Sequence, residues 1–471
     1  MTEAEHALPS TARAATLNTG KSRAAAADRR AHRRAAGLAA VWAIVLANAG
    51  VIVWLWVNGN NLSVNSTGEA FTSVARITGL LAAYLALIQV ILLARVPWLE
   101  RLVGFDRLTV WHRWNGFAVV WLTILHVVFS VWGYALMDRL SIGGELSTML
   151  GGGIYPGMIT ATVGTGLLLA VAASSMVIAR KRLPYEWWYA VHITTYAAIA
   201  LAWFHQIPTG NELVLDVTAA DYWRSLYLAT LALLVVFRLG VPVVQALRYR
   251  LRVAEVVEEG PGVVSLRMTG RNLERLKARS GQFFLWRFVA RGWWKTAHPF
   301  SLSTAPDGRS LRITVKALGD HTARLKSIPV GTRVVAEGPF GLFTDATRRR
   351  EKALLVAGGI GISPVRALVE DAEGDVDVVY RAVNDGDLVL RKELEDLARS
   401  RHVDVHYVVG DHAAPGGDQL LSPAHLAELV PDVADREVYV CGPPGMIDAV
   451  ARSIRAAGVP RRYIHTERFA L

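Results

Sequence analysis

Residues 112–126 read HRWNGFAVVWLTILH, and residues 192–205 read HITTYAAIALAWFH. Each stretch is largely apolar and carries a histidine at both ends. At a helical rise of about 1.5 Å per residue, the two histidines of one stretch lie roughly 20 Å apart along the axis. A histidine inside a bilayer is costly and usually functional, so these four residues organise our interpretation of the chain.

The four histidines can form two stacked pairs if the two stretches cross a membrane side by side. A hydrocarbon core of about 30 Å leaves room for one pair near each face. Paired imidazoles are axial ligands of haem iron, so we expect two b-type haems bound by His112, His126, His192 and His205. Hydrogen-bonded histidines within a helix bundle are the alternative. Zinc is disfavoured, because no carboxylate or cysteine completes a tetrahedral set.

The composition fits a chain that is partly membrane domain and partly soluble domain. Of the 471 residues 52% are hydrophobic, and the mean hydropathy is +0.29. Cys441 is the single cysteine, which excludes an internal disulfide. Six apolar segments have about the 20 residues that a transmembrane helix needs. They are Gly37–Val57, Phe71–Ala94, Thr109–Tyr134, Gly157–Ala179, Trp187–Trp203 and Trp223–Val243.

Charged residues between those segments predict the topology. Arginine and lysine gather before the first segment and after the second, fourth and sixth, whereas the other connections are acidic or sparsely charged. The positive-inside rule then places the N-terminus and everything after residue 246 in the cytoplasm of a multi-pass cell-membrane protein. The third and fifth segments run in the same direction. We therefore expect His112 to pair with His192 near the inner face, and His126 with His205 near the outer face.

The histidine spacing of the fifth segment does not suit a straight helix. The 14-residue step from His112 to His126 returns to within about 40° of the same helix face. The 13-residue step from His192 to His205 misses by about 140°. We expect the fifth helix to kink, tighten or widen between its histidines, or to approach the two cofactors from different sides.

Two further basic features need an explanation. Arg76 lies just inside the outer end of the second segment, where it needs an anionic partner such as a haem propionate or a negative species formed nearby. Snorkelling to the interface is the alternative. Residues 1–37 are rich in alanine and arginine, and we expect a disordered basic tail. The basic connections account for much of the formal charge of +11, so we expect no nucleic-acid partner.

The second half changes to short strands. Five alternating stretches with turns between them predict a small antiparallel β-barrel, at Leu251–Val257, Val263–Met268, Gln282–Phe288, Leu311–Ala317 and Arg333–Glu337. From residue 351 onward, four apolar strands alternate with helical stretches, which predicts an α/β doubly wound parallel sheet. These strands are Ala353–Ala357, Asp377–Tyr380, Val403–Val409 and Glu437–Cys441.

A glycine-rich turn follows the first strand of that sheet. Gly358, Gly359 and Gly361 let backbone N–H groups approach a pyrophosphate, with Ser363 as the cap and Pro364 in the first turn of the next helix. An NAD site usually has an acidic residue about 20 positions further on. Arg381 stands there instead, and an arginine suits the 2′-phosphate of NADPH, so we expect NADPH rather than NADH.

These motifs occur in an order that resembles the NADPH oxidase and ferric reductase family. His298-Pro299-Phe300-Ser301, the glycine turn, Cys441-Gly442-Pro443-Pro444-Gly445 and Phe469 are similar to the flavin and nicotinamide domains of the ferredoxin-reductase superfamily. The preceding four histidines complete the resemblance, which covers residues 38–471. It implies domains at 38–246 (six-helix transmembrane haem domain), 247–346 (FAD) and 347–471 (NADPH).

The resemblance also implies roles for individual residues. His298, Pro299, Phe300 and Ser301 line the flavin, with Ser301 near its reactive nitrogen. Lys316, His321 and Thr322 match the stretch that holds the FAD pyrophosphate. Gly359, Gly361 and Pro364 hold the NADPH pyrophosphate, Cys441 and Gly442 lie beside nicotinamide, and Phe469 covers the flavin. Arg76 matches the outer-haem arginine of the oxidases. Phe300 as core, Cys441 as a buried strand thiol and Phe469 as a C-terminal anchor are the plainer alternatives.

The expected function is therefore electron transfer across a membrane. Electrons pass from cytoplasmic NADPH through FAD and two haems to an acceptor on the outer face, either oxygen, giving superoxide, or ferric iron. The outer connections lack dense His, Asp or Glu, which slightly disfavours a dedicated iron site. An electron-transfer subunit that reduces a periplasmic protein or quinone is the alternative, and a haem sensor without turnover is disfavoured.

Overall fold

The computed structural model describes residues 10–151, 153–176, 182–294 and 296–468. The chain divides into two compact units. We call residues 37–239 the helical unit, and residues 240–471 together with the N-terminal residues up to Ala36 the sheet unit. Each unit is described by itself below.

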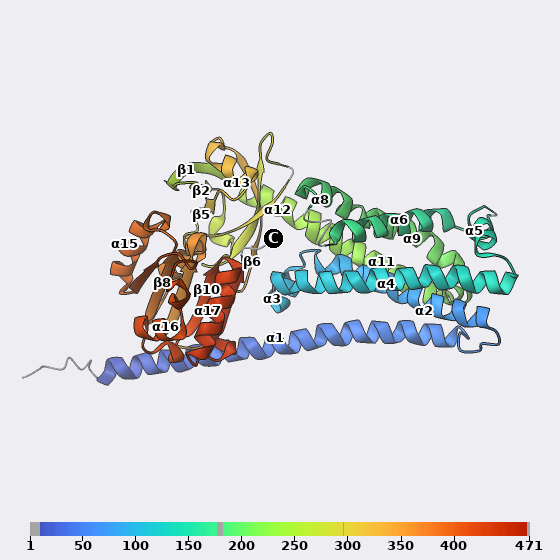
Figure 1. Ribbon diagram of the computed structural model, residues 1–471, viewed down its shortest axis with the longest axis horizontal. Helices are drawn as coiled ribbons and strands as arrows, with labels where there is room; N and C mark the ends of the chain where they lie inside the picture. The colour runs from blue at the N-terminus through green and yellow to red at the C-terminus, as the bar shows by residue number, and fades with distance from the viewer. Residues whose placement is uncertain (1–9, 152, 177–181, 295, 469–471) are drawn as a thin grey trace, which may run out of the picture. The chain divides into compact units, whose positions relative to one another are not determined.

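The helical unit consists of long helices joined by short ones (Figure 1). The helices that lie in it, or pass into it, are α1 (Ser10–Asn58), α2 (Thr67–Leu92), α3 (Pro97–Val103), α4 (Phe105–Asp138), α5 (Ile142–Gly151), α6 (Met158–Ser175), α8 (Tyr185–Ile193), α9 (Thr195–Thr209), α10 (Asn211–Leu215) and α11 (Val217–Leu234). A π-helical turn, Val235–Gly240, follows α11 and leads into α12 (Val241–Tyr249).

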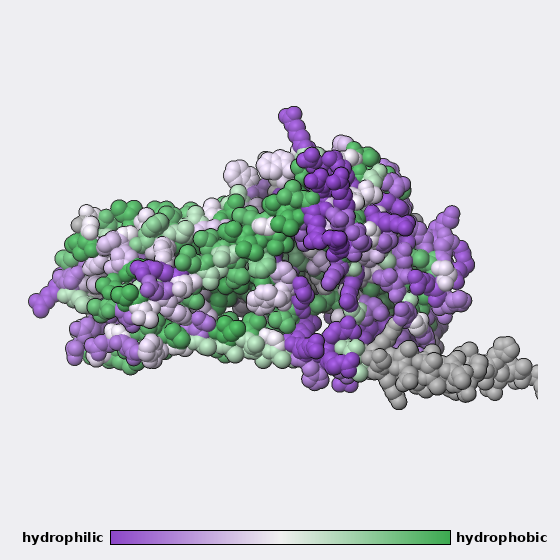
Figure 2. Space-filling model, turned by 180° about the vertical axis from the view of Figure 1, so that it is seen from behind, coloured by the Kyte–Doolittle hydropathy of each residue, from purple (hydrophilic) through white to green (hydrophobic). Residues whose placement is uncertain are grey.

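Among the described residues, five helical stretches are long and apolar enough to cross a membrane. They are Ala25–Asn58, Thr67–Leu92, Arg107–Asp138, Met158–Ser175 and Val217–Tyr249, and they correspond to five of the six predicted segments. Many large apolar side chains on them are exposed, and hydrophobic residues dominate the surface of the helical unit in Figure 2. Such a surface suits lipid rather than water.

The remaining predicted segment, Trp187–Trp203, is divided between α8 and α9. The division falls at Thr194, directly after His192 and Ile193. The Thr194 N–H donates to Val191 O at 3.1 Å, and the Thr194 and Thr195 hydroxyls donate to Val191 O and His192 O at 2.7 Å. Hydrogen bonds to the carbonyl three residues earlier are those of a 3₁₀ turn, which is tighter than an α-helical turn. The helix of the predicted fifth segment is therefore interrupted between His192 and His205, and both histidines lie beside their partners on α4.

Helix α1 begins at Ser10, within residues 1–37, for which the sequence predicted a disordered basic tail. Alanine and arginine are strong helix formers, and α1 continues without interruption into the first apolar segment. Helix nucleation by that segment lets the alanine-rich stretch extend as helix.

The first sheet of the sheet unit has six antiparallel strands in the order β4-β3-β6-β1-β2-β5. Its large buried side chains include Trp286, Phe284 and Phe288. Sequence periodicity missed β4, which is short and contains Pro299. The bounds are β1 (Arg252–Gly260), β2 (Val263–Thr269), β3 (Phe283–Val289), β4 (His298–Ser301), β5 (Ser310–Lys316) and β6 (Arg333–Phe340), with α13 at Asp320–Arg324.

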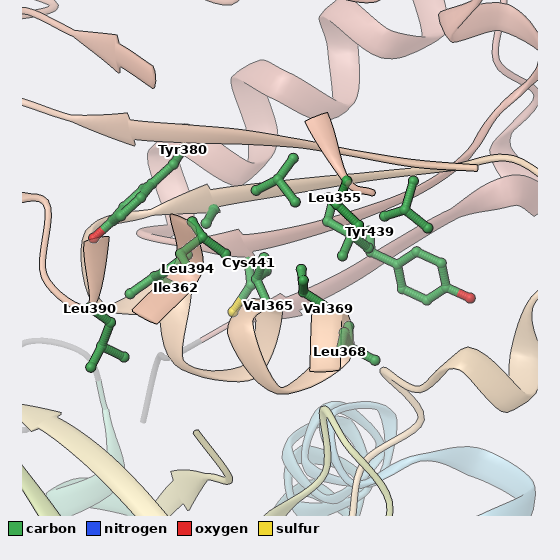
Figure 3. Packing of buried hydrophobic residues seen from close by; sticks show 14 of the residues in the cluster. Leu355, Ile362, Val365, Leu368, Val369, Tyr380, Leu390, Leu394, Tyr439 and Cys441 are labelled. Carbon is green, nitrogen blue, oxygen red and sulfur yellow. The ribbon is translucent and has the colours of Figure 1, made fainter. Parts of the chain in front are cut away.

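The second sheet has five parallel strands in the order β11-β10-β7-β8-β9. Its bounds are β7 (Ala353–Gly358), β8 (Val376–Ala382), β9 (Asp404–Val409), β10 (Glu437–Gly442) and β11 (Ile464–Arg468), with helices α14 (Ile362–Asp371), α15 (Arg391–Arg401), α16 (Pro423–Leu429) and α17 (Pro444–Ala456). Figure 3 shows the buried cluster between α14 and the strands, with Leu355, Val365, Tyr380 and Cys441 in it. The sequence missed β11.

An ion network with two buried arginines joins the two sheets within the sheet unit. Arg312 of β5 donates through both terminal nitrogens to the Glu393 carboxylate of α15, each at 2.8 Å. Arg366 of α14 lies 2.9 Å from the same carboxylate and also donates to Ser303 O at 3.1 Å. Burial acts to raise the pKa of Glu393, but the two guanidinium groups outweigh it and hold that pKa below its usual value. This network fixes the glycine turn of α14 against the first sheet.

Candidate functional site

The two predicted histidine pairs are brought together by α4 with α8 and α9. The ring centres of His112 and His192 are 6.0 Å apart, and those of His126 and His205 are 6.2 Å apart. A metal bound about 2 Å from one nitrogen of each ring separates the ring centres by roughly 6 Å. The residues present therefore fit two metal centres with paired imidazole ligands.

Hydrogen bonds orient the rings of α4. His126 Nδ1 lies 2.8 Å from Ala75 O, and His112 Nδ1 lies 3.2 Å from Gln89 O. Because a carbonyl only accepts, Nδ1 carries the proton in both rings, which leaves Nε2 as a free ligand atom. The His205 ring on α9 is likewise largely buried, with Nδ1 inaccessible to solvent. Sequence reasoning missed Gln89, although a glutamine within an apolar helix is a usable signal.

Gly79 of α2 makes room for His126. A Cβ atom at this position would lie 2.5 Å from His126 Nδ1, which is closer than side chains approach one another. The glycine thus allows α2 to pack directly against the imidazole. This close packing also lets the Ala75 carbonyl reach His126 Nδ1.

Arg76 is connected to the acidic side chain of Glu212 through a hydrogen-bonded asparagine, Asn61. Arg76 Nη1 donates to Asn61 Oδ1 at 2.8 Å, and Asn61 Nδ2 donates to Glu212 Oε1 at 2.5 Å. Asn61 and Glu212 are both buried. They are 151 positions apart in the chain, so no local pattern could predict this link. The connection shows how an arginine near the end of α2 is held in place by the protein itself.

The residues predicted to hold a flavin gather at β4 and the α13 turn. The His298 ring stacks on His321 with ring centres 3.8 Å apart, and Phe300 O accepts from Trp286 Nε1 at 2.9 Å. The buried Ser301 hydroxyl has no hydrogen-bond partner in the described part of the chain. An unsatisfied buried hydroxyl suits a group that a bound ring system would contact. The residues at β4 therefore fit a flavin.

The predicted pyrophosphate residues of the flavin lie near one another. Thr322 Oγ1 accepts from the N–H groups of Leu318 and Gly319 at 2.9 and 3.1 Å, which shapes the turn before α13. Lys316, at the end of β5, has its Nζ 3.7 Å from Asp387 Oδ1. The side chains of Lys316 and Thr322 therefore both lie near the end of β5. In the β3–β4 ladder, Pro299 lies opposite Leu285.

The glycine turn lies between β7 and α14, as predicted. Gly359 has φ +52° with open space around it, whereas a Cβ atom on Gly361 would lie 2.2 Å from Cys441 O. Gly358 faces Met446, and Gly442 faces Gly358. Ser363 does not cap α14, because the helix begins at Ile362. Its hydroxyl instead donates to Thr314 O at 3.3 Å, while Pro364 is buried in the first turn.

Arg381 and Cys441 lie at the carboxyl ends of their strands. The Arg381 guanidinium donates to Val408 O at 3.3 Å, to Gly410 O at 2.5 Å and to Ala382 O. Burial lowers the Arg381 pKa from its ordinary value. Cys441 is fully buried, and burial followed by the nearby Glu467 raises the pKa of its thiol. Phe469 lies outside the described residues.

Two classes of domain are thus combined, a helical membrane domain with paired histidines and a two-sheet domain of the flavin and nicotinamide type. The chain matches three families in this order: ferric reductase like transmembrane component at residues 78–203, FAD-binding domain at 248–344, and oxidoreductase NAD-binding domain at 355–452. This order is the domain architecture of the NADPH oxidase and ferric reductase family, and the chain has that architecture.

Curated relatives match only part of the chain. A ferredoxin reductase component of 3-ketosteroid-9-alpha-monooxygenase from Mycolicibacterium smegmatis is 31% identical over 46% of this chain and 65% of its own length. Ferredoxin--NADP reductase B from Sorangium cellulosum is 29% identical over 36% of this chain and 77% of its own. NADH-cytochrome b5 reductase 2 from Aspergillus oryzae is 28% identical over 32% and 51%. The chain spans about half to three quarters of the length of these relatives.

Proposed function

We propose that the protein carries electrons from cytoplasmic NADPH across the cell membrane to a one-electron acceptor on the outer face, oxygen or ferric iron. The two histidine pairs, with ring centres 6.0 and 6.2 Å apart, are the observation that carries this proposal. When bound, FAD and two b-type haems supply the conversion of a two-electron donor into one-electron transfers. Six membrane helices are part of the proposal, with α8 and α9 together as the fifth.

The residues of the chain divide the work as follows. The turn at Gly359 and Gly361 holds the pyrophosphate of NADPH at the start of α14. Ser301 donates a hydrogen bond to the flavin, and the imidazoles of α4, α8 and α9 hold the iron atoms. Arg76, held by Asn61, supplies positive charge at the end of the bundle where His126 lies. The basic connecting segments set the direction of transfer through the positive-inside rule.

The test is a spectrum of the purified full chain with FAD. NADPH added without oxygen is expected to produce a reduced b-type haem spectrum with two haems per chain, and oxygen or ferric citrate is expected to reverse it. A chain without haem, or haem that NADPH leaves oxidised, contradicts the proposal. Reduction by NADPH with reversal only by quinone or a partner protein supports the electron-transfer subunit instead.

Replacing Arg381 by alanine is expected to weaken NADPH selectively. A lost hydrogen bond to a charged group costs about 1.5–3 kcal/mol, so kcat/KM for NADPH falls about 10- to 100-fold while that for NADH changes little. The measurement is flavin reduction with each nucleotide. Arg399→Ala, an exposed arginine of α15 that pairs with Asp396, is the control.

Equal losses for NADPH and NADH in the Arg381 variant would remove the phosphate role. They would show that the role of the guanidinium is structural: its hydrogen bonds to Val408 O and Gly410 O connect the end of β8 to the end of β9.

A further inference from the structure

Four oxygen-bearing side chains meet at the C-terminal end of α4. Tyr134 and Asp138 belong to α4, Glu145 belongs to α5, and Tyr155 lies in the turn before α6. The rings of Tyr134 and Tyr155 meet edge to face with centres 5.7 Å apart. The Glu145 and Asp138 carboxylates both lie close enough to the Tyr155 phenol to raise its pKa, and Asp138 also raises the pKa of Glu145. We call these four residues the carboxylate–tyrosine cluster.

Glu145 is the unusual member of the cluster. It is 0% exposed, and neither of its carboxylate oxygens has a hydrogen-bond partner among the described residues. Asp138, its neighbour, also only accepts when ionised. Burial first, and then the Asp138 carboxylate, raise the pKa of Glu145. Two adjacent carboxylates with no donor between them need a proton or a cation to neutralise them.

The chemistry of the cluster selects among cations. Carboxylate oxygens are ligands for hard cations. A phenol oxygen joins such a set only after losing its proton, which a trivalent ion promotes more strongly than a divalent one. Two phenols beside two carboxylates therefore favour ferric iron over calcium or magnesium. This grouping is invisible in the sequence, where the same connection looks poor in acidic residues.

The location matches an electron acceptor. Tyr134 follows His126 by eight residues on the same helix, which is about 12 Å along the axis. We propose that the carboxylate–tyrosine cluster binds ferric iron and presents it for reduction next to the His126–His205 pair. This inference rests on the proposed function and narrows its acceptor. The balance is one NADPH and two ferric ions giving NADP⁺, one proton and two ferrous ions.

The test compares Glu145→Gln and Tyr155→Phe in the full chain loaded with FAD and haem. We expect KM for ferric citrate to rise about tenfold or more in both, as for lost metal-site partners. Oxygen consumption and haem reduction by NADPH are expected to change less than twofold. Gallium(III) citrate, which is redox-inert, is expected to inhibit the parent competitively and to bind in calorimetry, with both effects lost in the variants.

Asp221→Asn is the matched control, because Asp221 is an exposed aspartate of α11 that pairs with Arg224. Unchanged ferric KM in both variants overturns the inference, and so does an equal loss of oxygen and ferric activity. Calcium binding without gallium binding overturns the choice of iron. If NADPH fails to reduce the parent's haem, the proposed function fails, while gallium binding still tests the site. Tyr155→Phe decides the outcome if Glu145→Gln loses haem.

Discussion

Replacing His126 or His205 by leucine is expected to remove one haem per chain and to stop delivery of electrons to the outer acceptor. Leucine offers no lone pair, and the space between ring centres 6.2 Å apart then holds a single ligand. Losing even an outer-shell partner of a metal ligand costs about 10- to 100-fold, so losing the ligand itself costs more than about 100-fold in acceptor reduction. Flavin reduction by NADPH is expected to continue at the parent rate.

The measurement is haem content per chain together with NADPH-driven reduction of flavin and of ferric citrate or oxygen. Trp121→Leu is the control, because Trp121 lies on the same helix and is 63% exposed on its lipid-facing surface. Haem content that stays at the parent value in either histidine variant would contradict the assignment of that histidine as a haem ligand. Loss of flavin reduction as well would show that the variant had unfolded rather than lost one cofactor.

Sequence patterns predicted the partners of the four histidines, because hydropathy and charge report on membrane direction independently of packing. They left open how the fifth segment brings His192 and His205 to the same helix. In the structure the segment is broken at Thr194, where the hydroxyls of Thr194 and Thr195 donate to carbonyls three residues back. A threonine pair inside a helix has the same composition whether or not it makes these bonds, so the break was not predictable.

The residues that sequence reasoning missed are joined across long stretches of chain. Asn61 links Arg76 to Glu212, and Glu145 comes close to Asp138 and Tyr155 because α5 folds back onto α4. Patterns of period 2 or 3.6 report on the faces of single elements. They carry no information on which loops meet, and short strands such as β4 and β11 give too few residues for any period to emerge.

Replacing Gly361 by alanine is expected to impair the nicotinamide half while leaving the haem half intact. The added Cβ would lie 2.2 Å from Cys441 O and 2.9 Å from Gly442 Cα, so the glycine turn and the end of β10 must move apart. Forcing extra atoms into a packed site costs about 1–3 kcal/mol. If that strain falls on the bound state of NADPH, flavin reduction slows about 5- to 100-fold, because each 1.4 kcal/mol is a factor of ten.

Two reductants distinguish an effect on the nicotinamide half from an effect on the haem half. In the Gly361 variant, dithionite is expected to reduce flavin and haem at the parent rate, whereas NADPH is not. Gly386→Ala is the control, since a Cβ there meets nothing within 4 Å. Equal rates with NADPH in the Gly361 variant and the parent would mean that the turn yields without cost, and the pyrophosphate would then have to be held elsewhere. A loss that NADPH and dithionite share would place the damage in the fold, because both reductants need intact flavin and haem but only one needs this turn.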